Sequence, residues 1–188
     1  MQDVAENWIS ALKLILTLVI LIWGIEIINN FLGHRLGAYG IYPRNVEALP
    51  GILLWPFLHG SIHHLIMNTT PLLVMGFFVA LRGWWIFFKS VLLILVIGGL
   101  GVWLFGRPAY HIGASGLVFG FFGFLITLAI YERSIATFAI ASFTVVYYGG
   151  MILGILPTDK FVSWEGHLFG LLAGMLSARL LAVKKTTF

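Results

Sequence analysis

Long apolar runs divided by short polar stretches constrain the fold of this chain more than any other feature of its sequence. A helix needs about 20 mostly apolar residues to cross the hydrocarbon core of a bilayer. Of the 188 residues, 60% are hydrophobic and 10% are charged, a composition that water-soluble domains do not have. We therefore predict an all-α membrane protein, a bundle of six transmembrane helices over residues 11–28, 62–81, 84–105, 114–131, 135–156 and 167–183.

The basic residues predict the orientation of this bundle. An even number of spans places both ends of the chain on one side of the membrane. On that side fall Lys13, Arg82, Lys89, Arg133, Arg179, Lys184 and Lys185, and on the other side fall Arg35, Arg44, Arg107 and Lys160. Because cytoplasmic loops are enriched in Lys and Arg, we expect both termini in the cytoplasm.

Composition also excludes several classes of function. The chain has no cysteine, which excludes disulfides, thiolate catalysis and cysteine-ligated metals. Its formal charge of +4 does not indicate nucleic-acid binding, because the basic residues are scattered at helix ends. No internal repeat or soluble domain is visible. Residues 1–188 are expected to form one domain that is embedded in a cell membrane, such as a bacterial inner membrane. We expect no cofactor and no metal.

The connection between the first two predicted spans is long and contains a short apolar segment. Residues 29–61 are rich in turn-forming Gly and Pro. Within them, residues 52–58 are apolar but too short to span a bilayer, and Pro56 interrupts them. We expect this first loop to be partly inserted into the membrane, and the alternative is a loop that packs on the helix bundle.

Four polar side chains inside the predicted spans lie at a similar depth. Ser115 and His167 each precede the cytoplasmic end of their span by sixteen residues, which is about 24 Å of helix. His64 and Asn68 lie about 26 Å and 20 Å from the same end of theirs. Because polar groups inside a membrane are costly and usually functional, this layer is the first candidate for a site.

Glycines on two of these helices predict that Ser115 and His167 meet. Small residues at helical spacing let two helices approach closely, so the fourth and sixth spans should touch. A histidine beside a serine can take its proton and make it a nucleophile. His64 and Asn68 share one helix face and are suited to bind an oxyanion together with the Ser115 N–H. The glycines in question are Gly116, Gly120 and Gly123 after the serine, and Gly166, Gly170 and Gly174 around the histidine.

These motifs resemble those of the rhomboid intramembrane serine proteases. The resemblance rests on Gly113-Ala114-Ser115-Gly116, on Gly166-His167 with Gly170 and Gly174, and on His64-Leu65-Ile66-Met67-Asn68. It implies Ser115 as the nucleophile, His167 as the general base and then acid, and His64 with Asn68 as oxyanion donors. It also implies transmembrane protein substrates, cut near the outer face of the membrane in contact with lipid, and no nucleic acid. His59 aligns with a histidine at the boundary of the family's first loop, where we expect it to brace the loop by hydrogen bonding.

Two positions depart from the pattern of that family. Phe119 stands where many members have a tyrosine that stacks on the histidine. A phenyl ring can still pack on imidazole, so we expect activity to survive. The Trp-Arg pair that many members carry in the first loop is absent, and Tyr42-Pro43-Arg44 with Trp55-Pro56 occupies that region instead.

Other interpretations of the polar residues stay open at this point. Asp159 or Glu165 could orient the His167 ring, although the resemblance implies a dyad without an acid. Histidines 59, 63, 64 and 167 could bind a transition metal, although the adjacent pair 63 and 64 point apart on a helix. A catalytically inactive rhomboid relative is a third alternative, although such relatives usually lack the serine or the histidine.

Two segments near the candidate site are expected to control the access of a substrate to it. Residues 156–164 directly precede the histidine and could cap the site as a lid. By resemblance, the fifth span around Tyr147-Tyr148-Gly149-Gly150 is the side gate. Glu26 is expected to snorkel or to pair with a donor of the loop, and His34 and His111 are interpreted as loop residues.

Overall fold

A computed structural model describes residues 2–159 and 161–182 as a helical protein. Four positions used in the predictions, Lys160, Val183, Lys184 and Lys185, lie outside the described residues. Extended pairing within the described chain is limited to an isolated bridge between Ile41 and His111. The helices are α1 (Gln2–Phe31), α2 (Gly51–Leu54), α3 (Ile62–Ala80), α4 (Trp84–Leu93), α5 (Gly99–Phe105), α6 (Ser115–Glu132), α7 (Ile135–Tyr148) and α8 (Trp164–Leu181).

Several of these helices are long and apolar enough to cross a membrane. Within the described chain there are five such stretches, and they coincide with the first five predicted spans. The sixth prediction corresponds to α8, which is 18 residues long and is less apolar because it carries Glu165, His167 and Arg179. The fold is thus a helical bundle of the multi-pass membrane type, and the count of six spans stays a prediction. The five stretches are Glu6–Phe31, Ile62–Ala80, Trp84–Phe105, Ser115–Glu132 and Ile135–Ile155.

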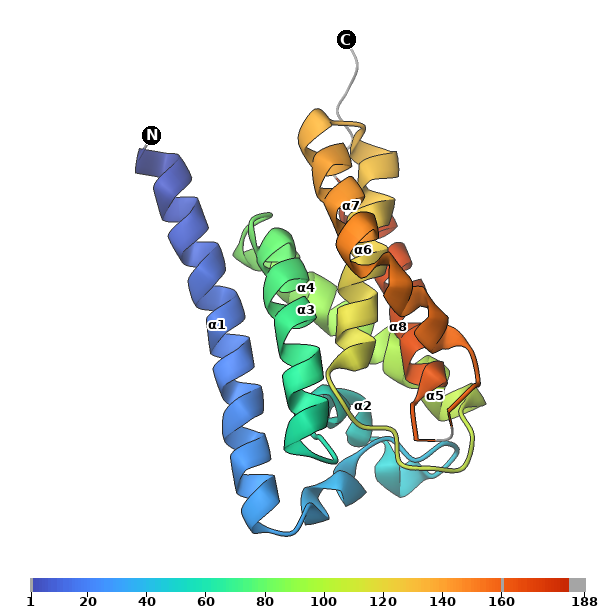
Figure 1. Ribbon diagram of the computed structural model, residues 1–188. Helices are drawn as coiled ribbons and strands as arrows, with labels where there is room; N and C mark the ends of the chain where they lie inside the picture. The colour runs from blue at the N-terminus through green and yellow to red at the C-terminus, as the bar shows by residue number, and fades with distance from the viewer. Residues whose placement is uncertain (1, 160, 183–188) are drawn as a thin grey trace.

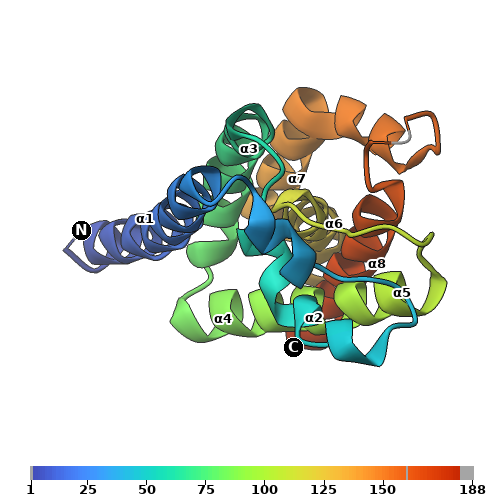
Figure 2. The same ribbon diagram turned by 90° about the horizontal axis from the view of Figure 1, so that it is seen from below.

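Helix α6 forms the centre of the bundle, and α3, α7, α8 and the α4–α5 run are arranged around it (Figure 2). In this helix 14 of the 18 residues are buried. Its sequence is apolar on every face, which is typical of a helix surrounded by other helices. Helix α1 begins at the same end of the bundle as the turn between α6 and α7, and the first loop covers the opposite end (Figure 1).

Helices α6 and α8 pack closely along the glycines predicted for this contact. A Cβ atom on Gly170 would lie 2.1 Å from the carbonyl oxygen of Gly116, and one on Gly174 would lie 1.8 Å from that of Gly120. Non-bonded heavy atoms are at their optimum near 3.5–4.0 Å, so no side chain fits at either position. The predicted contact between the two helices is confirmed.

The first loop packs on the bundle through its short apolar segment. Trp55, in the short 3-10 helix Trp55–Phe57 that follows α2, is 1% exposed. Its ring covers two glycines, since a Cβ atom on Gly116 would lie 1.9 Å from the ring and one on Gly166 would lie 3.1 Å from it. Leu53 and Leu54 on the other face are exposed. Packing on the bundle is therefore observed, and insertion of the free face into the membrane stays a prediction.

A buried polar cluster ties the first loop to the C-terminal end of α1. Glu26 and Asn29 are both 0% exposed. The Asn29 amide donates to Glu26 Oε2 at 2.9 Å and to the carbonyl oxygen of His59 at 3.0 Å, and its oxygen accepts from the N–H of Leu36 at 3.0 Å. His34 Nδ1 lies 3.4 Å from the second carboxylate oxygen. Glu26 thus pairs with Asn29 of α1 and lies at ion-pair distance from His34 of the loop, and it does not snorkel, because the side chain is fully buried.

Candidate active site

Ser115 is the first residue of α6, and two other elements hold the loop that leads into it. Gly113 has a φ of +118°, a conformation that glycine adopts without the clash a Cβ atom would cause. Its N–H donates to the carbonyl oxygen of Trp55 at 2.8 Å, and the N–H of Ala114 donates to His59 Nε2 at 3.2 Å. The serine therefore lies at a helix start, where free N–H groups favour negative charge.

His167 lies in the first turn of α8, which Ser163 caps by accepting from the N–H of Gly166 at 3.1 Å. Its Nε2 is 2.9 Å from Ser115 Oγ, and its Nδ1 is 2.8 Å from the carbonyl oxygen of Gly154. A carbonyl oxygen can only accept, so Nδ1 carries the proton and the lone pair of Nε2 faces the serine hydroxyl. This tautomer is the one that a general base requires.

The two predicted oxyanion donors lie on α3. The ring of His64 packs on Gly113, because a Cβ atom there would lie 2.6 Å from the ring. Asn68 follows one turn later on the same helix face and is 6% exposed. Its Nδ2 has no hydrogen-bond partner in the described part of the chain. An unpaired buried donor is costly, and a negatively charged oxygen would satisfy it.

His59 lies fully buried under the loop that leads into Ser115. Its ring is edge-on to that of His64, with centroids 5.0 Å apart. Burial, with a smaller contribution from His64, lowers the pKa of His59 to about 3. The ring is thus neutral near pH 7, and its Nε2 can accept from the N–H of Ala114. His59 therefore supports the backbone next to the candidate nucleophile.

Comparison with known proteins assigns the family. A model of the rhomboid domain matches residues 47–184. The chain belongs to the rhomboid family. An uncharacterized protein of Mycobacterium tuberculosis is 40% identical over 94% of this chain and 77% of its own length, and one of Mycobacterium leprae is 36% identical over 94% and 73%. The RHOMBOID-like protein 4 of Arabidopsis thaliana is 33% identical over 64% of this chain and 32% of its own length.

Phe119 of this rhomboid stacks on the imidazole, as expected from the sequence. The rings of Phe119 and His167 are 4.2 Å apart and 8° from parallel. The backbone of Gly154 packs against the imidazole from another side, because a Cβ atom on Gly154 would lie 3.0 Å from His167 Nδ1. The imidazole is therefore held by the stacked ring and by the backbone that carries its hydrogen-bond acceptor.

A second buried network, which the sequence analysis missed, links the loop before α6 to the loop before α8. His111 is 1% exposed; its Nδ1 is 2.6 Å from Ser163 Oγ and its Nε2 is 3.1 Å from the carbonyl oxygen of Arg107. The N–H of Arg107 donates to Glu165 at 3.2 Å. His111 is in a loop as expected, but it clamps together the segments that precede Ser115 and His167. Its serine partner lies 52 residues further along the chain, so no local pattern signals the contact.

The two carboxylates considered as a third catalytic residue have other partners in this rhomboid. Glu165 is 3.6 Å from the guanidinium Nε of Arg107, and Asp159 accepts from the N–H of Phe161 at 2.8 Å. Neither carboxylate takes the place of the Gly154 carbonyl at the histidine. Among residues 2–159 and 161–182, no three His, Asp or Glu side chains are grouped to hold a metal ion, and His63 is exposed.

The buried neutral state of His59 predicts acid sensitivity of the fold. Between about pH 6.5 and pH 3 the unfolded chain binds a proton on His59 that the native chain does not. The free energy of unfolding should therefore decrease as the pH is lowered through this window, by at most about 1.4 kcal/mol per pH unit for one proton. His59→Gln retains an acceptor for Ala114 but cannot titrate, so its thermal midpoint should fall less between pH 7 and pH 4.5.

His63→Gln provides the matched control for this pH experiment, because His63 is exposed on the adjacent helix. It should retain the pH dependence of the wild type. Equal slopes for the wild type and His59→Gln would contradict the assignment of a neutral, buried His59.

Proposed function

We propose that this rhomboid is a serine endopeptidase that hydrolyses a peptide bond of a transmembrane substrate near the outer membrane face. The observation that carries the proposal is the 2.9 Å contact between Ser115 Oγ and His167 Nε2, with Nδ1 held by the Gly154 carbonyl. A hydroxyl bonded to the free lone pair of an imidazole can lose its proton as its oxygen attacks.

The chemistry follows from these contacts. Ser115 Oγ attacks the substrate carbonyl carbon while His167 Nε2 takes the proton. His64, Asn68 and the N–H of Ser115 stabilise the oxyanion. His167 then protonates the leaving amine, and water hydrolyses the acyl-enzyme by the same sequence of steps. The Gly154 carbonyl supports the imidazolium through Nδ1–H, the role that a carboxylate has in a triad.

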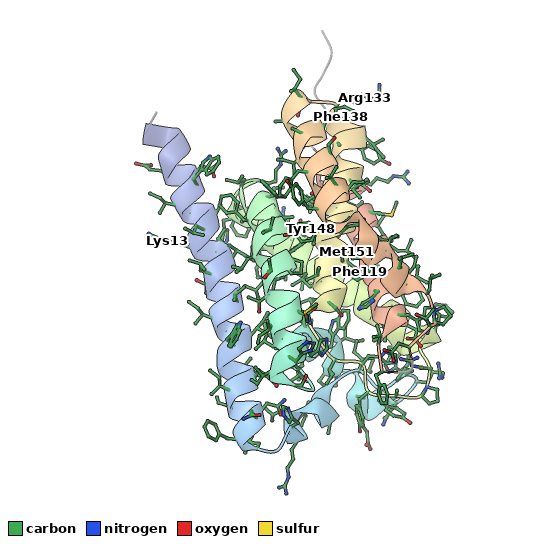
Figure 3. The ribbon with its side chains drawn as sticks, viewed as in Figure 1. Lys13, Phe119, Arg133, Phe138, Tyr148 and Met151 are labelled. Carbon is green, nitrogen blue, oxygen red and sulfur yellow. The ribbon has the colours of Figure 1, made fainter. Side chains whose placement is uncertain are left out.

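The proposed orientation places this chemistry near the outer face of a cell membrane. We infer six spans with α8 as the last, both termini in the cytoplasm, and residues 1–188 as one membrane domain. The end at which α1 begins also carries Arg133, and Lys13 lies on the half of α1 nearer to it (Figure 3). This distribution of basic residues supports a cytoplasmic location for that end. The first loop and the catalytic groups then lie at the outer end.

Substrate selection and access follow from the same geometry. An intact helix hides its peptide bonds, so substrates with helix-weakening residues near the cut are expected. In the stretch Ile135–Ile155 the apolar 18-residue window is 11% buried, the lowest value among the five apolar stretches, which supports a lateral gate at α7. Tyr147 is 71% exposed. Residues 156–164, which end at the first residue of α8, are proposed as the lid.

Labelling with a fluorophosphonate tests the proposed function. The purified wild-type protein in detergent should be labelled on Ser115, and Ser115→Ala should not. Ser177→Ala is the matched control, because Ser177 is a buried serine of α8 whose hydroxyl donates only to the Ala173 carbonyl within its own helix. Labelling that persists in Ser115→Ala would remove the nucleophile. An unlabelled wild-type protein would favour a rhomboid without activity.

Replacement of Asn68 separates an oxyanion role from a structural one. Asn68→Ala should lower kcat by about 10²-fold, as loss of one oxyanion donor does in other hydrolases. Its thermal midpoint should change little, because Nδ2 has no partner to lose within the described chain. The readouts are cleavage of a synthetic transmembrane peptide carrying a fluorophore and a quencher, and thermal unfolding.

The control for Asn68 is Thr127→Val, which removes another buried side-chain atom without a described partner, on α6. It should leave kcat unchanged. A large fall in the thermal midpoint of Asn68→Ala, with kcat retained, would identify Asn68 as a residue that only holds the helices together.

A further inference from the structure

A groove between α1 and α4 lies outside the machinery described above. Helix α1 makes its main helix contact with α3, which leaves a space of about 740 Å³ between α1 and the α4 side of the bundle. That volume is in the range of small-molecule sites. Most of the wall is apolar: Leu14, Leu18 and Leu21 follow one another at helical spacing on α1, and Phe87, Val91 and Leu95 do so on the opposite side.

The end of the groove nearest the N-terminus of α1 is polar. A surface that only contacts lipid chains does not need polar residues there. Asn7, Ser10 and Lys13 line this end from α1, and Thr17 lines the groove one turn beyond Lys13, between Leu14 and Leu18. Two of these have partners in the protein, since the Asn7 amide donates to the carbonyl oxygen of Leu81 at 3.3 Å and the Thr17 hydroxyl donates to that of Lys13 at 2.8 Å. Lys13 is exposed, and its ammonium group has no ion pair among the side chains of the described chain.

The predicted depth of Lys13 suits contact with a lipid phosphate. Lys13 lies two residues inside the predicted span 11–28, about 3 Å from its cytoplasmic end, and a lysine stem can extend back toward the interface. From Lys13 to Leu21 the groove continues for about 12 Å, comparable to the roughly 15 Å that one leaflet contributes to the hydrocarbon core. An acyl chain below a phosphate at Lys13 would therefore lie along the leucines.

The charges of the groove select the headgroup. Its lining includes one cation, Lys13, and no carboxylate. Glu6, seven residues earlier on α1, does not line it. A phosphate has a partner in the ammonium group, whereas the amine of a zwitterionic headgroup has none within the groove. We propose that this groove binds one anionic glycerophospholipid of the leaflet at the N-terminal end of α1, with its phosphate on Lys13 and an acyl chain along the apolar wall.

Native mass spectrometry of the full chain tests this site without reference to proteolysis. The detergent-solubilised protein is titrated with phosphatidylglycerol and phosphatidylcholine of identical acyl chains. The wild type should retain one phosphatidylglycerol with a preference of about fivefold, the size expected for one lysine near an anionic headgroup. Lys13→Gln should bind both lipids equally. Lys89→Gln, which removes an exposed lysine of α4 outside the groove, should retain the wild-type preference.

A second variant tests the apolar wall separately from the charge. Val91→Trp fills the groove and should reduce retention of both lipids, with an unchanged elution volume and thermal midpoint showing that the protein is folded. Equal retention of phosphatidylglycerol by the wild type and Lys13→Gln would overturn the proposal. Loss of the preference in Lys89→Gln to the same extent would do so as well, because binding would then be nonspecific. A lipid-free dimer that Val91→Trp abolishes would identify a second copy as the occupant instead.

Discussion

Alanine in place of His167 is expected to slow peptide hydrolysis by about 10⁴- to 10⁶-fold. The imidazole is the only group of the described chain hydrogen-bonded to Ser115 Oγ, so without it the hydroxyl has no acceptor for its proton. The loss corresponds to about 5–8 kcal/mol of transition-state stabilisation. Cleavage of the quenched transmembrane peptide measures it, with circular dichroism to confirm that the helices remain.

Combination of His167→Ala with Ser115→Ala sharpens this test. The two residues act as one unit, so the double variant should be no slower than the slower single variant. His63→Ala, an exposed histidine of α3, should leave the rate unchanged. Additive losses in the double variant would mean that the two side chains contribute independently, which is incompatible with a dyad.

A single methyl group on Gly174 should impair activity from a distance. A Cβ atom there would lie 1.8 Å from the Gly120 carbonyl oxygen, so α6 and α8 must move apart. Displacement of reacting groups by about 1 Å can cost about 10²-fold in rate, and overpacking typically costs about 1–3 kcal/mol of stability. We therefore expect Gly174→Ala to lower both the cleavage rate, by about 10²-fold, and the thermal midpoint.

Gly24→Ala is the matched control for Gly174→Ala. No atom lies within 4 Å of a Cβ built on Gly24, and alanine favours a helix over glycine by about 1 kcal/mol. This variant should be fully active and equal or higher in thermal midpoint. Full activity of Gly174→Ala would show that the close approach of α6 and α8 is not what sets the distance between Ser115 and His167.

The sequence predicted those parts of the molecule that depend on periodicity along one helix. Apolar length predicted five helical stretches that the structure contains. Glycines at a spacing of three or four predicted the α6–α8 contact, because a strip of small residues has an effect only where a second helix lies against it. The sixth predicted span corresponds to α8, which is not among the five apolar stretches because Glu165, His167 and Arg179 make it more polar.

Contacts between loops could not be predicted in this way. His111 and Ser163 are 52 residues apart, and each is an ordinary polar residue in its local sequence. The same holds for Asn29, whose side chain joins Glu26 to the carbonyl oxygen of His59. Such pairs carry no periodic signal, because their proximity depends on how separate helices direct the loops between them.

The sequence by itself predicted which stretches form long apolar helices and that the two glycine-lined helices, α6 and α8, are in contact. The tertiary structure alone decided the protonation of the histidine, because the acceptor of Nδ1–H is a backbone carbonyl at Gly154, and every residue type has one. It also decided that Trp55 covers Gly116 and that His59 holds the Ala114 N–H. The periodicity of a sequence predicts only which face of a single helix is buried. These contacts form between several separate elements, so no single pattern predicts them.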